Sequence, residues 1–213
     1  MGPPMLEEIA KHLGRPIDAG CKLIENILSV PTKKLGDLLG DQVSYWQWSN
    51  RLRIAELAAM KLRAKGITPH GLPADFAIPL LRECGDAEDP NLQEWWAELL
   101  ASAVATEPLR HVGFVHTLQS MAAADVKFLD AMLSSEPVER DGRIELVAKA
   151  SGLSVEQANV SFHNLESLGF FTPTASKLKG FAFDFLSACY PHPDRISAYR
   201  EKQSKLGGGV IVD

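Results

Sequence analysis

Apolar side chains recur every three or four residues along most of the chain, which is the period of a helix that buries one face. The clearest case begins at Asp89, which suits a helix N-cap, and Pro90, whose missing N–H costs nothing in a first turn. The apolar side chains that share one face of this stretch are Leu92, Trp95, Trp96, Leu99, Leu100, Ala103 and Val104. The pattern therefore predicts a helix over 89–104 whose structural core includes both adjacent tryptophans.

The same period predicts further helices at 5–13, 16–30, 32–65, 74–84, 110–121, 123–134, 143–152 and 155–169. The helix over 32–65 is the longest, and Trp46 and Met60 are among its apolar positions. Gly36 and Gly40 weaken its first turns by about 1 kcal/mol each relative to alanine, so a break in this helix stays open.

After residue 169 the pattern changes from helical spacing to alternation. Phe170 and Phe171 open an expected strand, and the alternating Phe181, Phe183 and Phe185 predict a second strand to about Phe183, followed by a short helix. The order of two helices, a short turn and strands resembles a winged helix-turn-helix, a module of many transcription regulators. The glycines near the C-terminus predict a flexible tail.

The sequence therefore predicts a mainly α fold, in which a helical N-terminal and central region is followed by a winged helix-turn-helix-like module with a small β-wing. A chain of 213 residues has room for one large domain or two small ones. The expected segments are an N-terminal helical segment with a long helix at 1–66, a central helical region at 67–124, the winged-helix-like module at 125–190 and a flexible tail at 191–213.

Charge and cysteine content narrow the classes of function. The formal net charge of −5 argues against a general polyanion binder, although residues 1–70 hold ten Lys and Arg against seven Asp and Glu. Cys21, Cys84 and Cys189 form no CxxC pair, which favours reduced thiols in a cytoplasmic protein. The sequence shows neither a signal peptide nor a run of about 18 apolar residues, which also favours the cytoplasm.

In a DNA-binding regulator, the helix over 155–169 would be the recognition helix of the winged-helix-like module. The candidate contacts on its outward positions are Gln157, Asn159, His163 and Asn164. Glu156 and Glu166 share that surface, and no Lys or Arg lies between Lys149 and Lys177. Because DNA binding depends on neutralising phosphates, DNA is disfavoured as a partner but stays an alternative.

The segment YWQWSNRLRI at 45–54 mixes aromatic and basic residues, as contacts to nucleic acids or membrane surfaces do. Its candidate contact residues are Trp48, Arg51 and Arg53. The aromatic and basic side chains spread around the helix rather than sharing one face, so packing within the domain is the favoured interpretation. The segment 17–40 combines an apolar stripe with three lysines, so peripheral membrane contact is a further alternative.

No sequence motif points to an enzyme. Signatures of nucleotide-binding loops, zinc proteases and serine hydrolases do not occur in the sequence. The acidic turn GDAEDP at 85–90 has ligands for a hard cation, but a solvated turn that ends in a helix cap is the simpler interpretation. We therefore expect no catalytic residue, no metal site and no cofactor.

Three stretches together resemble one bacterial family, the abortive-infection alpha proteins. They are LGDLLGDQVSYWQWSNRLRIAELAAMKLRAKGITP at 35–69, LPADFAIPLLRECGDAEDPNLQEWWAELLASAV at 72–104 and FVHTLQSMAAADVKFLDAML at 114–133. The resemblance spans about Leu35 to Cys189, and the run from Trp96 to Ala101 is its most recognisable part. SMAAAD at 120–125 departs from the Ser-Pro-Asp-type helix start that is usual in the family, which puts the local helix cap in doubt.

The resemblance implies a role in defence against phage, in which an infected cell arrests or dies before the phage matures. It brings no catalytic residue with it. We therefore expect a non-enzymatic defence component that works through a protein partner or through self-association. A nucleic-acid-binding regulator and a membrane-acting toxin are the alternatives.

Overall fold

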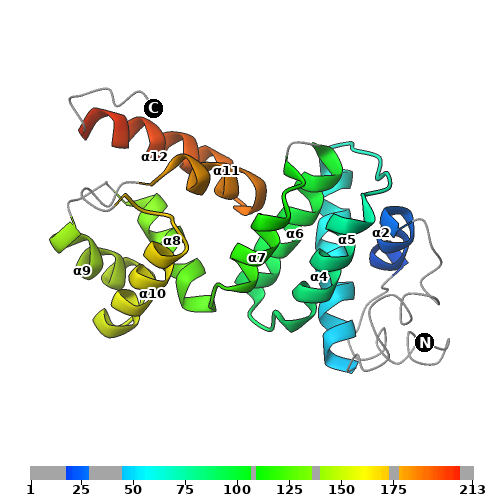
Figure 1. Cartoon of the computed structure of the whole chain (residues 1–213), viewed down its shortest axis with the longest axis horizontal. Helices are drawn as coiled ribbons and strands as arrows, with labels where there is room; N and C mark the ends of the chain where they lie inside the picture. Colours follow the sequence, from blue (N-terminus) through cyan, green and yellow to red (C-terminus); the bar gives the residue numbers. More distant parts are fainter. Residues whose placement is uncertain (1–17, 29–44, 107–108, 136–139, 173–177, 207–213) are drawn as a thin grey trace. The chain divides into compact units, whose positions relative to one another are not determined.

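The computed structural model describes residues 18–28, 45–106, 109–135, 140–172 and 178–206 of the chain (Figure 1). The chain divides into two compact units, Met1–Gln119 and Ser120–Asp213. The predicted mainly α fold is confirmed, because every regular element in the described residues is a helix. The helix expected at 5–13 and the part of the long helix expected at 32–44 lie outside the described residues.

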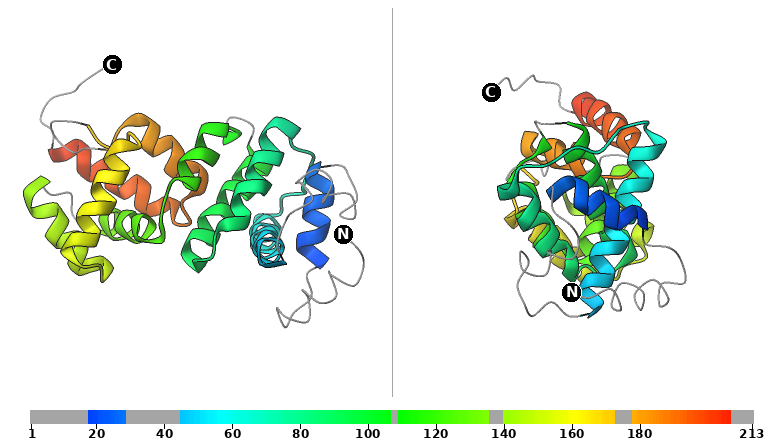
Figure 2. Two further views of the ribbon diagram at one scale, coloured as in Figure 1. Left: turned by 60° about the horizontal axis from the view of Figure 1, so that its bottom comes forward. Right: turned by 90° about the vertical axis from the view of Figure 1, so that its right-hand side faces the viewer.

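The described helices of the first unit are α2 (Asp18–Leu28), α4 (Tyr45–Ala64), α5 (Ala74–Glu83), the short 3-10 helix η2 (Cys84–Asp86), α6 (Pro90–Ala105) and α7 (Val112–Gln119). Helix α4 lies between α2 and α6 (Figure 2). Gly20 lets α2 approach α4 closely, since a Cβ at this position would lie 2.7 Å from the carbonyl oxygen of Leu52. Trp48 of α4 and Trp96 of α6 are the largest fully buried side chains of this unit.

Helix α6 begins at the predicted residue because its predicted cap forms. The Asp89 carboxylate accepts hydrogen bonds from the backbone N–H groups of Asn91, at 2.8 Å, and Leu92, at 3.3 Å. Pro90 occupies the first turn, where no intrahelical donor is needed. The acidic turn at 85–90 therefore ends in a helix cap, as the sequence indicated.

The described helices of the second unit are α8 (Ala123–Ser134), α9 (Arg140–Ser151), α10 (Val155–Ser167), α11 (Gly180–Cys189) and α12 (Pro193–Leu206). The core of this unit contains a group of aromatic rings. Phe162 of α10 stacks on Phe171 with ring centroids 4.9 Å apart and meets Phe128 of α8 edge-on at 6.3 Å. Gly152 and Gly169 follow the ends of α9 and α10 with φ values of 71° and 84°, a conformation that favours glycine after a helix.

The predicted small β-wing and the winged-helix module are not supported by the structure. Phe171 and Leu178 form an isolated antiparallel bridge, and the described residues contain no strand. The side-chain amide of Gln203 on α12 pairs with both backbone groups of Leu178. It accepts from the N–H at 3.1 Å and donates to the carbonyl oxygen at 3.2 Å. A helix side chain therefore makes the hydrogen bonds that a neighbouring strand would make.

The expected strand up to Phe183 is wrong, because α11 begins at Gly180. The alternating phenylalanines fit a strand, but the buried residues of this stretch have helical spacing. These buried residues are Ala182, Phe183, Phe185, Leu186, Ala188 and Cys189. Phe181, the first of the alternating rings, is partly exposed. Burial in the unit therefore decides between two periods that the sequence leaves ambiguous.

The flexible tail expected at 191–213 is wrong for residues 193–206, which form α12. Ile196 and Tyr199 are buried one turn apart, and the guanidinium of Arg200 lies 4.3 Å from the ring centroid of Phe183. These tertiary contacts stabilise α12 as a helix, although the polar composition of its sequence does not predict one. The glycine-rich end at 207–213 lies outside the described residues.

Candidate protein-interaction surface

Trp48 and Arg51, two of the three candidate contact residues, lie inside the first unit, which agrees with the favoured interpretation of packing within the domain. Arg51 is 3% exposed, and its Nε and Nη2 donate to the carbonyl oxygens of Leu81, at 2.6 Å, and Arg82, at 3.0 Å. Its guanidinium lies 5.7 Å from the ring centroid of Trp48. Gly85 leaves room for this group, since a Cβ there would lie 2.6 Å from the guanidinium carbon. Burial lowers the pKa of Arg51.

Amide side chains extend the contacts of Arg51 into a buried polar network. Asn50 of α4 donates to the carbonyl oxygen of Gly85 at 2.9 Å. Gln93 of α6 donates to the side-chain oxygen of Asn50 at 3.2 Å and to the carbonyl oxygen of Ala87 at 2.8 Å. The network satisfies backbone groups of the turn between α5 and α6, and so it fixes that turn against α4.

The structure places the aromatic pair of α6 in the core. Trp95 and Trp96 are buried together with Leu99 and Leu100, while Leu92 is half-buried. Three polar residues that the helical period puts on the opposite face are buried as well, namely Gln93, Glu98 and Ser102. Helix α6 is therefore an internal helix, and its tryptophans serve the fold of the first unit.

Helix α4 has a row of exposed side chains along one face, which we call the α4 surface. Trp46, Arg53 and Met60 are spaced by seven residues and therefore share a face, since seven residues make about two helical turns. Trp46 is 44% exposed and Met60 is 54% exposed, although the sequence pattern counted both among apolar helix positions. The half-buried Leu57 lies on the same face and completes the α4 surface.

The positive charge of the α4 surface resides on Arg53, which is exposed and has no ion pair within the described part of the chain. The lysines near the end of α4 are neutralised by α6. Lys61 lies 2.9 Å from the carboxylate of Glu94 and 3.2 Å from that of Glu98, which Lys65 also meets at 2.8 Å. Burial acts to lower the pKa of Lys61, but the two carboxylates outweigh it and raise that pKa.

Two of the four candidate recognition residues on α10 are engaged by the fold of the second unit. Gln157 closes a capping box with Ser154, in which each side chain accepts the backbone N–H of the other residue, at 3.0 and 3.2 Å. Asn164 donates to the carboxylate of Asp125 at 2.7 Å and to the carbonyl oxygen of Ser120 at 3.2 Å. The capping box was readable from the spacing of Ser154 and Gln157 in the sequence, whereas the Asn164 contact was not.

The Asn164 contact also explains how α8 begins without a capping side chain at Ala122. Asp125 accepts the backbone N–H of Ala122 at 2.8 Å and is held in place by the amide of Asn164. The departure from a Ser-Pro-Asp-type start in SMAAAD is thus compensated from α10 rather than from within the segment.

The other two candidate recognition residues do not make α10 a basic surface. His163 is exposed, with its Nδ1 3.4 Å from the carboxylate of Glu166, and Asn159 is half-buried. Val160 is 70% exposed beside them, and Glu156 is exposed as well. Since the helix sequence contains no Lys or Arg, this face has no group that would neutralise a phosphate backbone.

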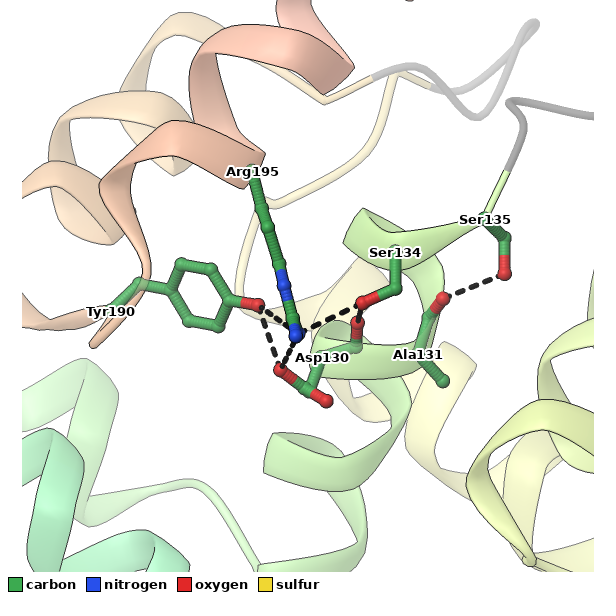
Figure 3. Close-up of polar contacts among 6 residues, drawn as sticks. All are labelled: Asp130, Ala131, Ser134, Ser135, Tyr190 and Arg195. Atoms are coloured by element: carbon green, nitrogen blue, oxygen red, sulfur yellow. Dashed lines mark hydrogen bonds and ion pairs between the residues drawn. The ribbon is translucent and has the colours of Figure 1, made fainter.

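A polar cluster that the sequence did not reveal joins α8 to the start of α12 (Figure 3). One carboxylate oxygen of Asp130 accepts from the Tyr190 hydroxyl at 2.7 Å and from Nη1 of Arg195 at 2.8 Å. The same Nη1 donates to the hydroxyl of Ser134 at 2.9 Å. Burial, together with the hydrogen bond to Asp130, raises the pKa of Tyr190. Because these groups satisfy one another across a helix junction, we interpret the cluster as a clamp between helices.

The described residues contain neither a metal site nor a membrane-spanning helix. No group of three or more His, Cys, Asp or Glu side chains there is arranged to hold a metal ion. None of the helices described is long and apolar enough to cross a lipid bilayer.

These features define a mainly helical protein with two compact units and a buried polar network at the turn before α6. The chain belongs to the abortive infection alpha family, whose sequence profile matches residues 49–207. No curated protein and no solved structure matches the chain. Membership of this family indicates a role related to abortive infection.

Proposed function

We propose that this protein acts in abortive infection through protein contacts made by the α4 surface, without a catalytic centre of its own. The observation that carries the proposal is the exposed Arg53, which has no ion pair in the described residues and lies between the exposed Trp46 and Met60. Helices α2 and α6 pack against other faces of α4. Trp, Met and Arg are enriched at the centres of protein interfaces, where a few such residues carry most of the binding free energy.

The chemistry of the α4 surface also describes its partner. Trp46 and Met60 are about 21 Å apart along the helix axis at 1.5 Å per residue, a length typical of a helix that binds in a groove. Arg53 lies midway between them, and its planar guanidinium pairs best with a carboxylate. The partner surface is therefore an apolar groove with an acidic residue near its middle.

Neither alternative has a comparable observation in its favour. A DNA-binding regulator would need Lys or Arg on α10, and the sequence of that helix contains neither. The segment proposed for a membrane-acting toxin spans 17–40, and most of it lies outside the described residues. The protein-contact proposal is therefore the one that the described surface supports best.

The double variant Trp46→Ala/Met60→Ala tests the proposal in cells. A bacterium that carries this gene with its neighbouring genes is challenged with phage, and the number of plaques is compared between variants. We expect the double variant to lose protection, while its free energy of unfolding changes by no more than about 1 kcal/mol because both side chains are exposed.

Val160→Ala is the matched control, because it shortens an exposed apolar side chain on a helix of the other unit. This control should protect as well as the wild type. Full protection by a folded double variant would contradict the proposal, and equal loss of protection in the control would remove the assignment to α4.

A further inference from the structure

A cavity of about 270 Å³ lies between α2, the C-terminal half of α4 and the loop that follows α4. Leu23 of α2 and Leu62 of α4 line its apolar part together with Ile67 of the loop. Lys22 and Arg63 line it from the two helices. The cavity involves none of the residues of the α4 surface, which lie on another face of the helix.

Local structure at the end of α4 builds one wall of this cavity. Gly66 adopts a φ of 67°, and the chain turns back so that the N–H of Ile67 donates to the carbonyl oxygen of Leu62 at 2.9 Å. This is the hydrogen bond of a helix end closed by a glycine, and it holds the loop residue against the last turn of α4. The backbone N–H of Leu72 then bonds to the carbonyl oxygen of Ile27 at 2.9 Å, which ties the loop to α2.

The close approach of α2 and α4 shapes the rest of the cavity. The helices touch at Gly20, and the next lining positions carry the small side chains of Ala19 and Ala59. Small side chains on facing helices leave the volume that larger ones would fill. The result is a partly apolar hollow beside a tight helix crossing.

The charges around this cavity all have one sign. Lys22 and Arg63 are exposed, and neither has a hydrogen bond or an ion pair within the described residues. Among the described lining residues there is no Asp or Glu, and Asn26 and Thr68 supply neutral polar groups. Two cations that have no partner among the described residues, beside a concave apolar surface, match a ligand with an anionic head and an apolar body.

We propose that the α2–α4 cavity binds a small amphiphilic anion, with a carboxylate or phosphate head held by Lys22 and Arg63 and a short apolar chain over Leu23, Leu62 and Ile67. Its volume lies just below the roughly 300 Å³ at which pockets for drug-sized ligands begin, so a short chain fits and a large ring system does not. The proposal stands independently of the α4 surface.

Four probes test the proposal with the full-length protein by titration calorimetry, namely octanoate, octyl phosphate, octanol and inorganic phosphate. We expect octanoate or octyl phosphate to bind saturably below about 10 mM, and the tighter of the two identifies the head group. Octanol and inorganic phosphate should each bind at least about tenfold more weakly, because each lacks one half of the recognised chemistry.

The variant Lys22→Gln/Arg63→Gln should weaken binding of the better probe by about tenfold or more. Arg82→Gln is the matched control, because Arg82 is an exposed arginine of the same unit outside the cavity lining, and it should bind like the wild type. The single variants Lys22→Gln and Arg63→Gln should each cause a smaller loss, which keeps the test valid if the double variant does not fold.

Four results would overturn the proposal. They are no saturable binding of either amphiphile, octanol binding as tightly as octanoate, inorganic phosphate binding as tightly as octyl phosphate, and an affinity that the glutamine variants leave unchanged. The result of the phage-protection experiment on the α4 surface does not affect any of these binding outcomes.

Discussion

Arg51 and Arg53 are two residues apart on α4, yet their surroundings are opposite. Arg51 is buried and donates to two carbonyl oxygens, whereas Arg53 is exposed and has no ion pair in the described residues. One arginine of α4 therefore supports the fold, while another arginine two residues later on the same helix lies at the surface.

We expect Arg51→Ala to lower the free energy of unfolding by about 3 kcal/mol, because one buried and one partly buried hydrogen bond from a charged donor to a carbonyl oxygen are lost. Arg53→Ala should change it by no more than about 0.5 kcal/mol, since the side chain is exposed. Urea unfolding followed by circular dichroism measures both. Equal losses of stability in the two variants would contradict the placement of Arg51.

The thiol of Cys84 lies in the same buried region, and burial raises its pKa to about 12. At pH 8 only about one Cys84 in ten thousand is then a thiolate, which is the reactive form. In the folded protein we expect Cys84 to be alkylated at least about a hundredfold more slowly than Cys21, which is half-buried. Mass spectrometry of the labelled peptides measures both rates, and equal rates in the folded protein would contradict the burial of this thiol.

For single residues, helical periodicity in the sequence predicted buried side chains of α6, but it could not predict contacts with residues far away along the chain. The spacing of apolar residues placed Trp96 on a core face, and the side chain is 1% exposed. Arg51 was a candidate contact residue for which packing within the domain was favoured, but nothing within α4 reveals the carbonyl oxygens of Leu81 and Arg82, about 30 residues later, that accept its hydrogen bonds. The exposure of Trp46 could not be predicted for a related reason, since periodicity does not show which apolar positions a neighbouring helix covers.

At the scale of elements, the helices were predictable wherever local capping and period agreed. Asp89 and Pro90 predicted the start of α6, and the structure confirms both. The predictions of a β-wing and of a flexible tail were both wrong for the same reason, because α12 forms and is held by contacts with residues earlier in the second unit. Gln203 pairs with the backbone of Leu178, and Tyr199 is buried, although the helix that carries them is strongly polar in sequence.

The clamp formed by Asp130, Tyr190 and Arg195 gives the second unit a measurable dependence on pH. Folding raises the pKa of Tyr190 above the value of about 10 of an unfolded tyrosine. The stabilisation from Tyr190 is therefore complete below about pH 10 and is lost as the pH rises from there towards the folded-state pKa.

Tyr190→Phe should cost about 1 kcal/mol of unfolding free energy at neutral pH, because it removes the hydrogen bond to Asp130. Above about pH 10 the wild type should lose stability more steeply than the variant, so the two curves converge. Urea unfolding of both proteins from about pH 7 to pH 11 measures this difference. Parallel curves over the whole range would contradict the raised pKa.

At the scale of the whole molecule, the division into two compact units predicts that core damage stays local. Trp96→Ala should destabilise the first unit by about 3–5 kcal/mol, as expected for truncating a fully buried large side chain. Hydrogen exchange should then accelerate in α2 and α4 to α7, while exchange in α8 to α12 stays as in the wild type. Equal acceleration in both units would show that they unfold as one.

The family of the chain and its mainly α class were within reach of the sequence, because signature segments and helical periods are local. The proposed contact surface was not, because it depends on which residues of α4 stay exposed once α2 and α6 have packed against the helix. The exposed row of Trp46, Arg53 and Met60 is thus a property of the assembled unit rather than of any segment in it.

We propose that this member of the abortive infection alpha family works through a protein contact centred on Arg53. The most direct measurement is the plaque count on cells that carry Arg53→Glu in place of the wild type, with the free energy of unfolding measured on the purified variant. We expect protection to be lost while the free energy of unfolding changes by less than about 0.5 kcal/mol, because a reversed charge at an exposed position repels an acidic partner and leaves the core unchanged. A stable Arg53→Glu protein that protects as fully as the wild type would contradict it.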